Sequence, residues 1–213
     1  DCPPLVTQLM GREELMKKLI LASLVGLTAL PVVADSDFSA EFLLGKTDQE
    51  ARTDYGDVEG DDTSIGIRGG YSINENVTLE LSYNNYGEAD ESYVDQFGDD
   101  INDKVSTTSI NFGVKGSIPL NNGLSIYARI GLSLWDVEFE ETDSFYPGET
   151  FKGDDSGNDI YYGLGLQYQI NDKAFIGAEY TLSEYGVKLG GDFQGLDADV
   201  DIKNFALSIG LNF

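Results

Sequence analysis

Phe205-Ala206-Leu207-Ser208-Ile209-Gly210-Leu211-Asn212-Phe213 is the stretch of this sequence that decides the fold. Every second residue is large and apolar, and the residues between them are small or polar. Successive side chains of a β-strand point to opposite faces, so one face of this strand is wholly apolar. An apolar face opposite a face of Ala, Ser, Gly and Asn favours a transmembrane sheet. The apolar face of such a sheet contacts lipid, and the other face lines a polar lumen.

The same alternation recurs along the chain and predicts eight strands. Most of these segments approach or exceed the roughly 10 residues that a tilted transmembrane strand needs. None of them has a sustained helical period of 3.6 residues. The sequence therefore predicts an all-β fold, an eight-stranded antiparallel transmembrane up-and-down β-barrel. The predicted strands are 38–47, 63–73, 77–87, 105–118, 124–135, 160–170, 174–184 and 202–213.

The connections between these segments alternate in length. Short, turn-rich connections are predicted at 74–76, 119–123 and 171–173. The other connections are long and acidic, and they cover 48–62, 88–104, 136–159 and 184–203. Outer-membrane barrels combine short periplasmic turns with long external loops, and an even number of strands leaves both termini in the periplasm. We therefore expect periplasmic termini and extracellular acidic loops.

The face opposite the apolar one carries six charged residues, one on each of six strands. Three are acidic and three are basic, and they are Glu41, Arg68, Glu80, Lys115, Arg129 and Glu179. Eight strands enclose only enough space for side chains to fill. Because an unpaired buried charge is very costly, these charges should be paired. The sequence predicts a lumen plugged by an ion-pair and hydrogen-bond network, and the alternative is a wetter, leaky interior.

The charge balance of the whole chain is strongly acidic. Asp and Glu number 38 against 13 Lys and Arg, for a net charge of −25, and the sequence has no histidine. The predicted long connections hold 28 of these acids and 5 of the bases. Nucleic-acid binding is excluded as a function because phosphates are neutralised by Lys and Arg. The acidic connections should repel one another and stay mobile unless cations or partners screen them.

Two acidic stretches, Asp57–Asp62 and Lys152–Asp159, are candidate Ca²⁺ sites. A specific Ca²⁺ site needs six or more arranged oxygens, and neither stretch has the ligand order of an EF-hand. A solvated acidic loop is the favoured interpretation, so no metal ligand and no cofactor is predicted. Divalent cations remain candidate partners of these loops.

The N-terminal part of the chain has the three zones of a secretory signal peptide. Met16-Lys17-Lys18 is basic, Leu19 to Leu30 is apolar, and Pro31-Val32-Val33-Ala34 supplies small residues at a cleavage position. We expect a signal peptide at 16–34, a barrel at 35–213, and an upstream over-extension at 1–15. A retained anchor is the alternative, although the apolar run is shorter than the roughly 20 residues of a spanning helix. Residues 35–213 contain no cysteine, so no disulfide is expected there.

Together, the signal peptide, the eight segments, the connection lengths and the terminal Phe213 resemble the transmembrane domain of outer-membrane protein A and related small outer-membrane β-barrel proteins. Residue-level similarity is strongest over residues 171–180 and in the last strand. The resemblance implies a barrel surrounded by outer-membrane lipid and lipopolysaccharide. It also implies insertion by the barrel-assembly machinery, which reads a C-terminal strand with a final aromatic residue. The residues that match this assembly signal are Phe205, Leu207, Ile209, Leu211 and Phe213.

The function expected from these observations is that of a non-enzymatic envelope protein with an acidic surface for cations or partners. A narrow ion-conducting pore is the alternative, although open channels need about 16 strands. An outer-membrane enzyme is disfavoured because histidine, the usual acid or base near neutral pH, is absent. No catalytic residue is predicted. A soluble secreted β-barrel that binds a small ligand in its mouth, with its apolar side chains inside, is a further alternative.

Overall fold

A computed structural model describes residues 37–53, 56–94 and 97–213. The expected signal peptide, the upstream piece and Cys2 lie outside the described residues. No described helix is long and apolar enough to cross a membrane. The elements are β1 (Phe38–Thr53), β2 (Gly56–Asn74), β3 (Val77–Val94), β4 (Asp100–Pro119), β5 (Leu124–Asp143), β6 (Phe151–Gln169), β7 (Ala174–Lys188), the short 3-10 helix η1 (Gly191–Phe193) and β8 (Asp197–Asn212).

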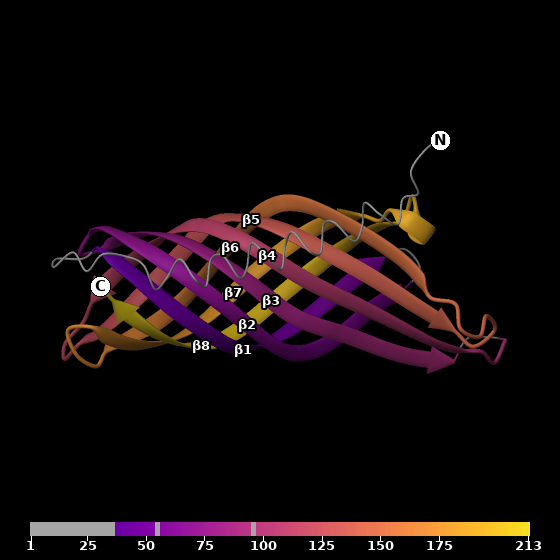
Figure 1. Ribbon diagram of the computed structural model, residues 1–213, viewed down its shortest axis with the longest axis horizontal. Coiled ribbons are helices and arrows are strands. Elements are labelled where there is room, and N and C mark those ends of the chain that lie inside the picture. Colours follow the sequence, from indigo (N-terminus) through magenta and orange to yellow (C-terminus); the bar gives the residue numbers. More distant parts are fainter. Residues whose placement is uncertain (1–36, 54–55, 95–96) are drawn as a thin grey trace, which may run out of the picture. The chain divides into compact units, whose positions relative to one another are not determined.

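The strands form a closed antiparallel barrel in which each strand pairs with its neighbours in the sequence (Figure 1). Closure is made by β1 and β8, whose pairing begins at Ser39↔Asn212. The C-terminus therefore lies beside the beginning of β1, at the end of the barrel that carries the short turns. The prediction of an eight-stranded up-and-down β-barrel is confirmed.

The outer surface of the barrel carries a continuous apolar band. Its side chains stand largely free of protein contact; Phe112 is 57% exposed, Leu164 is 66% exposed and Leu207 is 58% exposed. Since the apolar face points outward, the soluble alternative, which needed these side chains inside, is wrong. The band is the surface that a bilayer would cover.

The predicted long connections are wrong in extent, because most of their residues are strand. Only 54–55 separate β1 from β2, and only 144–150 separate β5 from β6. The physical reason is that polar and apolar residues still alternate in the acidic segments, but there the polar residues face outward and the apolar residues face inward. Asp and Glu occupy the outward positions there, as Asp48 does, and apolar residues occupy the inward ones, as Val137 does. High acidity is compatible with a strand whose outer face is in water.

A hydrophobic core fills this acidic end of the barrel. Trp135 stacks on Tyr185 with ring centroids 5.3 Å apart, and Val137 and Val200 are fully buried. Apolar side chains thus face outward along the apolar band. Beyond the band they face inward, as in a soluble protein. The buried cluster comprises Ala51, Val58, Tyr86, Ala89, Val105, Trp135, Val137, Phe139, Tyr185, Val187, Leu189, Ala198, Val200 and Ile202.

Beyond the apolar band the ladder of the barrel is interrupted along two seams. The pairing of β2 with β3 extends only to Ile65↔Asn85, and that of β6 with β7 only to Tyr161↔Ser183. The other strand pairs continue to the acidic end. The strands remain side by side at both seams: a Cβ on Gly60 would lie 2.8 Å from the Cα of Ala89, and the N–H of Gly190 donates to the carbonyl of Asp154 at 3.2 Å. We call this end the sandwich, because in the described residues its ladders form two sheets, β7-β8-β1-β2 and β3-β4-β5-β6, with the apolar core between them.

Each of the two seams of this sandwich is bridged by an aspartate. The backbone N–H of Glu88 donates to Oδ2 of Asp62 at 3.0 Å across the β2/β3 seam. The backbone N–H of Lys188 donates to Oδ2 of Asp155 at 2.6 Å across the β6/β7 seam. Hydrogen bonds from backbone N–H groups of Glu88 and Thr63 hold the pKa of Asp62 below its ordinary value. These carboxylates replace ladder hydrogen bonds where the ladder is interrupted.

Changing Asp62 to alanine is expected to abolish hydrogen-exchange protection of the Glu88 amide, because that amide then loses its acceptor across the seam. Asp61→Ala is the matched control, since the carboxylate of Asp61 pairs with Lys46 on the outer face. Amide exchange measured by NMR distinguishes the two variants. Unchanged protection in Asp62→Ala would mean that the seam is closed without this carboxylate.

Candidate functional site

The six charged residues predicted for the lumen lie together inside the barrel. They come from β1, β2, β3, β4, β5 and β7. Each projects inward because it lies an odd number of positions along its strand from the residues of the apolar band; we call such positions inward parity. All six are buried: Glu41 is 6% exposed, Arg68 6%, Glu80 3%, Lys115 6%, Arg129 3% and Glu179 3%. At this depth every charge needs a partner.

Arg68 makes the best-directed contacts of the group. Its Nη1 donates to Oε2 of Glu179 at 2.9 Å, and its Nη2 donates to Oε1 of Glu179 at 2.8 Å. Nη1 also donates to Oε2 of Glu41 at 3.1 Å. A bidentate arginine–carboxylate pair is strong and fixes both side chains in one plane. Arg68 therefore links β1, β2 and β7 across the closure of the barrel.

The remaining contacts complete a ring of alternating charge. Lys115 Nζ lies 3.5 Å from Glu80 and 3.8 Å from Glu41. Arg129 lies 3.1 Å from Glu179 and 3.6 Å from Glu80. Each acid contacts two bases and each base contacts two acids, so the ring spans the lumen. Its order is Glu41, Arg68, Glu179, Arg129, Glu80 and Lys115.

Arg129 is held differently from Arg68. None of its three nitrogens has a well-directed hydrogen bond in the described residues, although two of them make ion pairs. Its guanidinium instead lies over the ring of Tyr127, 4.8 Å from the centroid. The ring of charges thus has one firmly held arginine and one that is held mainly by Coulomb attraction and by an aromatic face.

Two uncharged members of the network were missed by sequence reasoning. The Tyr127 hydroxyl donates to Glu179 at 3.2 Å, and Lys115 donates to Gln167 on β6 at 3.4 Å. Both residues have inward parity, so alternation was the signal that could have found them. Tyr127 fits because its neighbour Gly165 has no side chain; a methyl group there would collide with the tyrosine ring.

A polar layer separates this ring from the apolar core. Oδ1 of Asn204 accepts hydrogen bonds from Thr47 at 2.9 Å and from Ser64 at 2.6 Å. The hydroxyls of Ser133 and Tyr185 lie 2.9 Å apart. Charged ring, polar layer and apolar core therefore follow one another along the barrel axis. This arrangement can block the lumen, and it holds its carboxylates in ion pairs.

The predicted assembly residues lie on β8, at the edge that closes on β1. Phe205, Leu207, Ile209 and Leu211 all point outward, and Phe213 follows directly after the strand. They are 46% to 59% exposed and belong to the apolar band. None of them contacts the charged ring.

The two acidic stretches considered for Ca²⁺ lie on strands rather than in loops. Asp57–Asp62 belongs to β2 and Lys152–Asp159 to β6. Alternation sends consecutive carboxylates, such as Asp61 and Asp62 or Asp154 and Asp155, to opposite faces of their strand, so these pairs do not converge on one ion. Within residues 37–53, 56–94 and 97–213, no group of three or more His, Cys, Asp or Glu side chains is arranged to hold a metal.

The chain matches a protein family by sequence. The sequence profile described as the outer membrane protein beta-barrel domain matches residues 19–213. No curated protein matches the chain significantly.

Three solved outer-membrane structures are similar in fold. Neisserial surface protein A is 15% identical, with 84% of this chain and 98% of that one covered and a TM-score of 0.53. AlkL is 12% identical, with 86% and 95% covered and a TM-score of 0.54. The outer membrane protease OmpT from Escherichia coli is 9% identical, with 87% and 99% covered and a TM-score of 0.50.

Proposed function

Because this chain belongs to the outer membrane protein beta-barrel domain family, we propose that it is a non-enzymatic outer-membrane barrel with a sealed lumen, whose function lies at its acidic surface. The observation that carries this proposal is the closed ring of six alternating charges across the lumen. Opening a path for ions would require breaking buried ion pairs, which is costly. The apolar core beyond the ring adds a second barrier to water and ions.

The proposed orientation of the barrel in the outer membrane rests on the difference between its acidic end and its short-turn end. The apolar band lies in the bilayer of lipid and lipopolysaccharide, and the acidic sandwich extends outside the cell. Both ends of the mature barrel, residues 35–213, then face the periplasm after cleavage of the signal peptide at 16–34. The location of the C-terminus among the short turns supports this orientation, as does the rule that periplasmic turns are short. The barrel-assembly machinery would read β8 from that side.

The fold by itself does not decide whether the protein is an enzyme, since OmpT is a protease with a similar fold. Two observations support a non-enzymatic role. The chain has no histidine, and each buried carboxylate of the lumen is engaged in ion pairs. Cations near the acidic outer surface would form a screening layer rather than occupy a coordination site.

A narrow pore is the second candidate, and the weak anchoring of Arg129 favours it. Single-channel recording in a planar bilayer separates the two functions. For protein purified from outer membranes and shown to be folded by its heat-dependent gel shift, we expect no discrete conductance steps at neutral pH. Steps that change in size in Arg129→Ala, and remain unchanged in the outer-face variant Lys46→Ala, would overturn the sealed lumen and establish the pore.

A further inference from the structure

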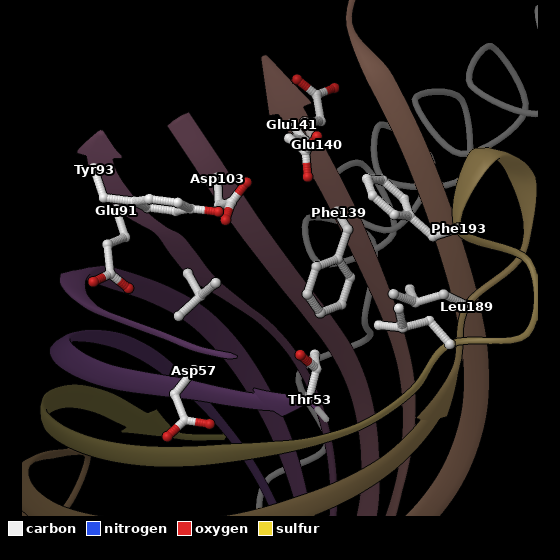
Figure 2. Close-up of a pocket in the computed structure, with 12 residues that line it drawn as sticks. Thr53, Asp57, Glu91, Tyr93, Asp103, Phe139, Glu140, Glu141, Leu189 and Phe193 are labelled. Atoms are coloured by element: carbon white, nitrogen blue, oxygen red, sulfur yellow. The ribbon is translucent and has the colours of Figure 1, made fainter. Parts of the chain in front are cut away.

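The sandwich has a cavity of about 490 Å³ near the final residues of β1, β3 and β5, at the end of the barrel opposite to the short turns. Figure 2 shows the residues that line it. It lies between the two sheets and is covered on one side by the connection from β7 to β8. Small-molecule sites in proteins commonly have volumes of about 300–1,000 Å³. The cavity therefore has the size of a ligand site rather than of a packing defect.

The floor of the cavity is apolar. Val58, Phe139 and Leu189 are buried members of the hydrophobic core that also line the cavity. Phe193 and Leu196, from the β7–β8 connection, pack against the same core. Such a floor is hydrophobic surface that a ligand with an apolar body would cover.

One wall of the cavity carries a row of three carboxylates. Glu91 pairs with Asp103 in the register of β3 and β4, and Asp103 pairs with Glu141 in the register of β4 and β5. All three have inward parity, line the cavity and are half-buried. Directly beneath this row, the next inward row is the apolar set Ala89, Val105 and Phe139.

This row departs from the prevailing pattern of the sandwich, where most acids point outward and apolar residues point inward. The inward-facing Asp62, Asp155 and Asp159 each accept a hydrogen bond from an N–H group, whereas the three acids of the row lie opposite one another. Like charges directly opposite one another destabilise a sheet. Burial, with the neighbouring Glu91, raises the pKa of Asp103, against a hydrogen bond from Tyr93. Burial, Asp103 and Asp143 raise the pKa of Glu141. The described residues that line the cavity include no Lys or Arg to offset these charges, and local rules are commonly broken at functional sites.

We propose that this cavity binds an amphipathic organic cation, meaning an ammonium, amidinium or guanidinium group attached to an aromatic or aliphatic body. The inference deepens the proposed surface function and rests on the mouth of the barrel facing the outside. The cationic head would lie against Glu91, Asp103 and Glu141. Its body would cover the apolar floor.

The aromatic residues of the cavity suit the same ligand. Figure 2 shows the Tyr93 hydroxyl directed toward Asp103, with the rings of Phe139 and Phe193 on the other side of the cavity. Aromatic faces attract organic cations, and they do so more strongly where water is excluded. A hydrated divalent ion would gain nothing from the apolar floor, and an anion would be repelled by the carboxylate row.

The test is titration of the full-length protein, folded in nanodiscs of zwitterionic lipid, with benzamidinium by isothermal calorimetry. We expect saturable binding, and binding at least about tenfold weaker for the isosteric neutral amide benzamide. Equal binding of the two compounds would reduce the site to an apolar pocket and overturn the proposal. So would displacement of benzamidinium by equimolar Ca²⁺, which would indicate a plain cation site.

Matched variants locate the binding. Asp103→Asn with Glu141→Gln should weaken benzamidinium binding about tenfold or more. Glu59→Gln with Asp199→Asn removes the same charge from the exposed outer face and should change binding less than about twofold. Phe193→Ala, which leaves all charges in place, should also weaken binding. Equal losses in the two double variants would mean nonspecific attraction to the acidic surface.

Binding should also weaken as the pH falls through the raised pKa values of Asp103 and Glu141, because protonation removes the charges that attract the cation. The conductance recordings report on the lumen alone. Failure of ligand binding would therefore leave the sealed barrel intact, and conductance would leave the cavity proposal intact.

Discussion

Replacing Glu179 with glutamine is expected to lower the free energy of unfolding by about 3–5 kcal/mol, the cost of removing one partner from a buried ion pair. Glu179 contacts Arg68 through two hydrogen bonds and Arg129 through an ion pair. The neutral amide would leave two buried arginines with one carboxylate each. Trp135, the single tryptophan of the chain, is buried in the core, so its fluorescence can follow unfolding in denaturant.

The control for this variant is Glu184→Gln, which makes the same change on the exposed outer face of the same strand. We expect its free energy of unfolding to stay within about 0.5 kcal/mol of the parent value. A loss below about 1 kcal/mol in Glu179→Gln would be typical of solvated ion pairs. That result would favour the wetter, leaky lumen over the sealed one.

Replacing Leu207 with arginine is expected to impair assembly, because a charged side chain on the lipid face near the bilayer midplane costs about 2–4 kcal/mol. Leu207 is 58% exposed, and on the outer face of β8 it lies between Phe205 and Ile209. The measurement is the amount of heat-modifiable protein in isolated outer membranes. We expect a large fall relative to the parent protein.

Ser156→Arg is the matched control for the lipid-face variant. Ser156 points outward on β6 beyond the apolar band, and its cross-strand neighbour is Asp136, so an arginine there remains in water beside an acid. Normal assembly is expected. If Leu207→Arg assembled as well as Ser156→Arg, the assignment of the apolar band to lipid would be wrong.

The alternation of residues determined the fold, the strand count and the two faces of each strand. Side-chain direction in a strand depends only on parity, which is a local property. For that reason Glu41, Arg68 and the other four lumen charges could be named from the sequence. The strand ends could not be found in the same way. Acidic composition was interpreted as loop at positions such as Asp48 and Glu138, which are outward positions of strands whose inner face is apolar.

What only the tertiary structure decided is which residues meet. Parity placed Arg68 and Glu179 in the lumen, but their bidentate contact requires closure of β1 on β8. The acidic row forms only because the registers of β3, β4 and β5 align Glu91, Asp103 and Glu141. Register and closure arise from pairing between distant segments. Shifting one strand against its neighbour by an even number of residues leaves the same side chains on each face, so the alternation does not determine the register. The sequence alone therefore determined the faces of the barrel, whereas the charged ring, the two seams of the sandwich and the cavity depend on long-range pairing.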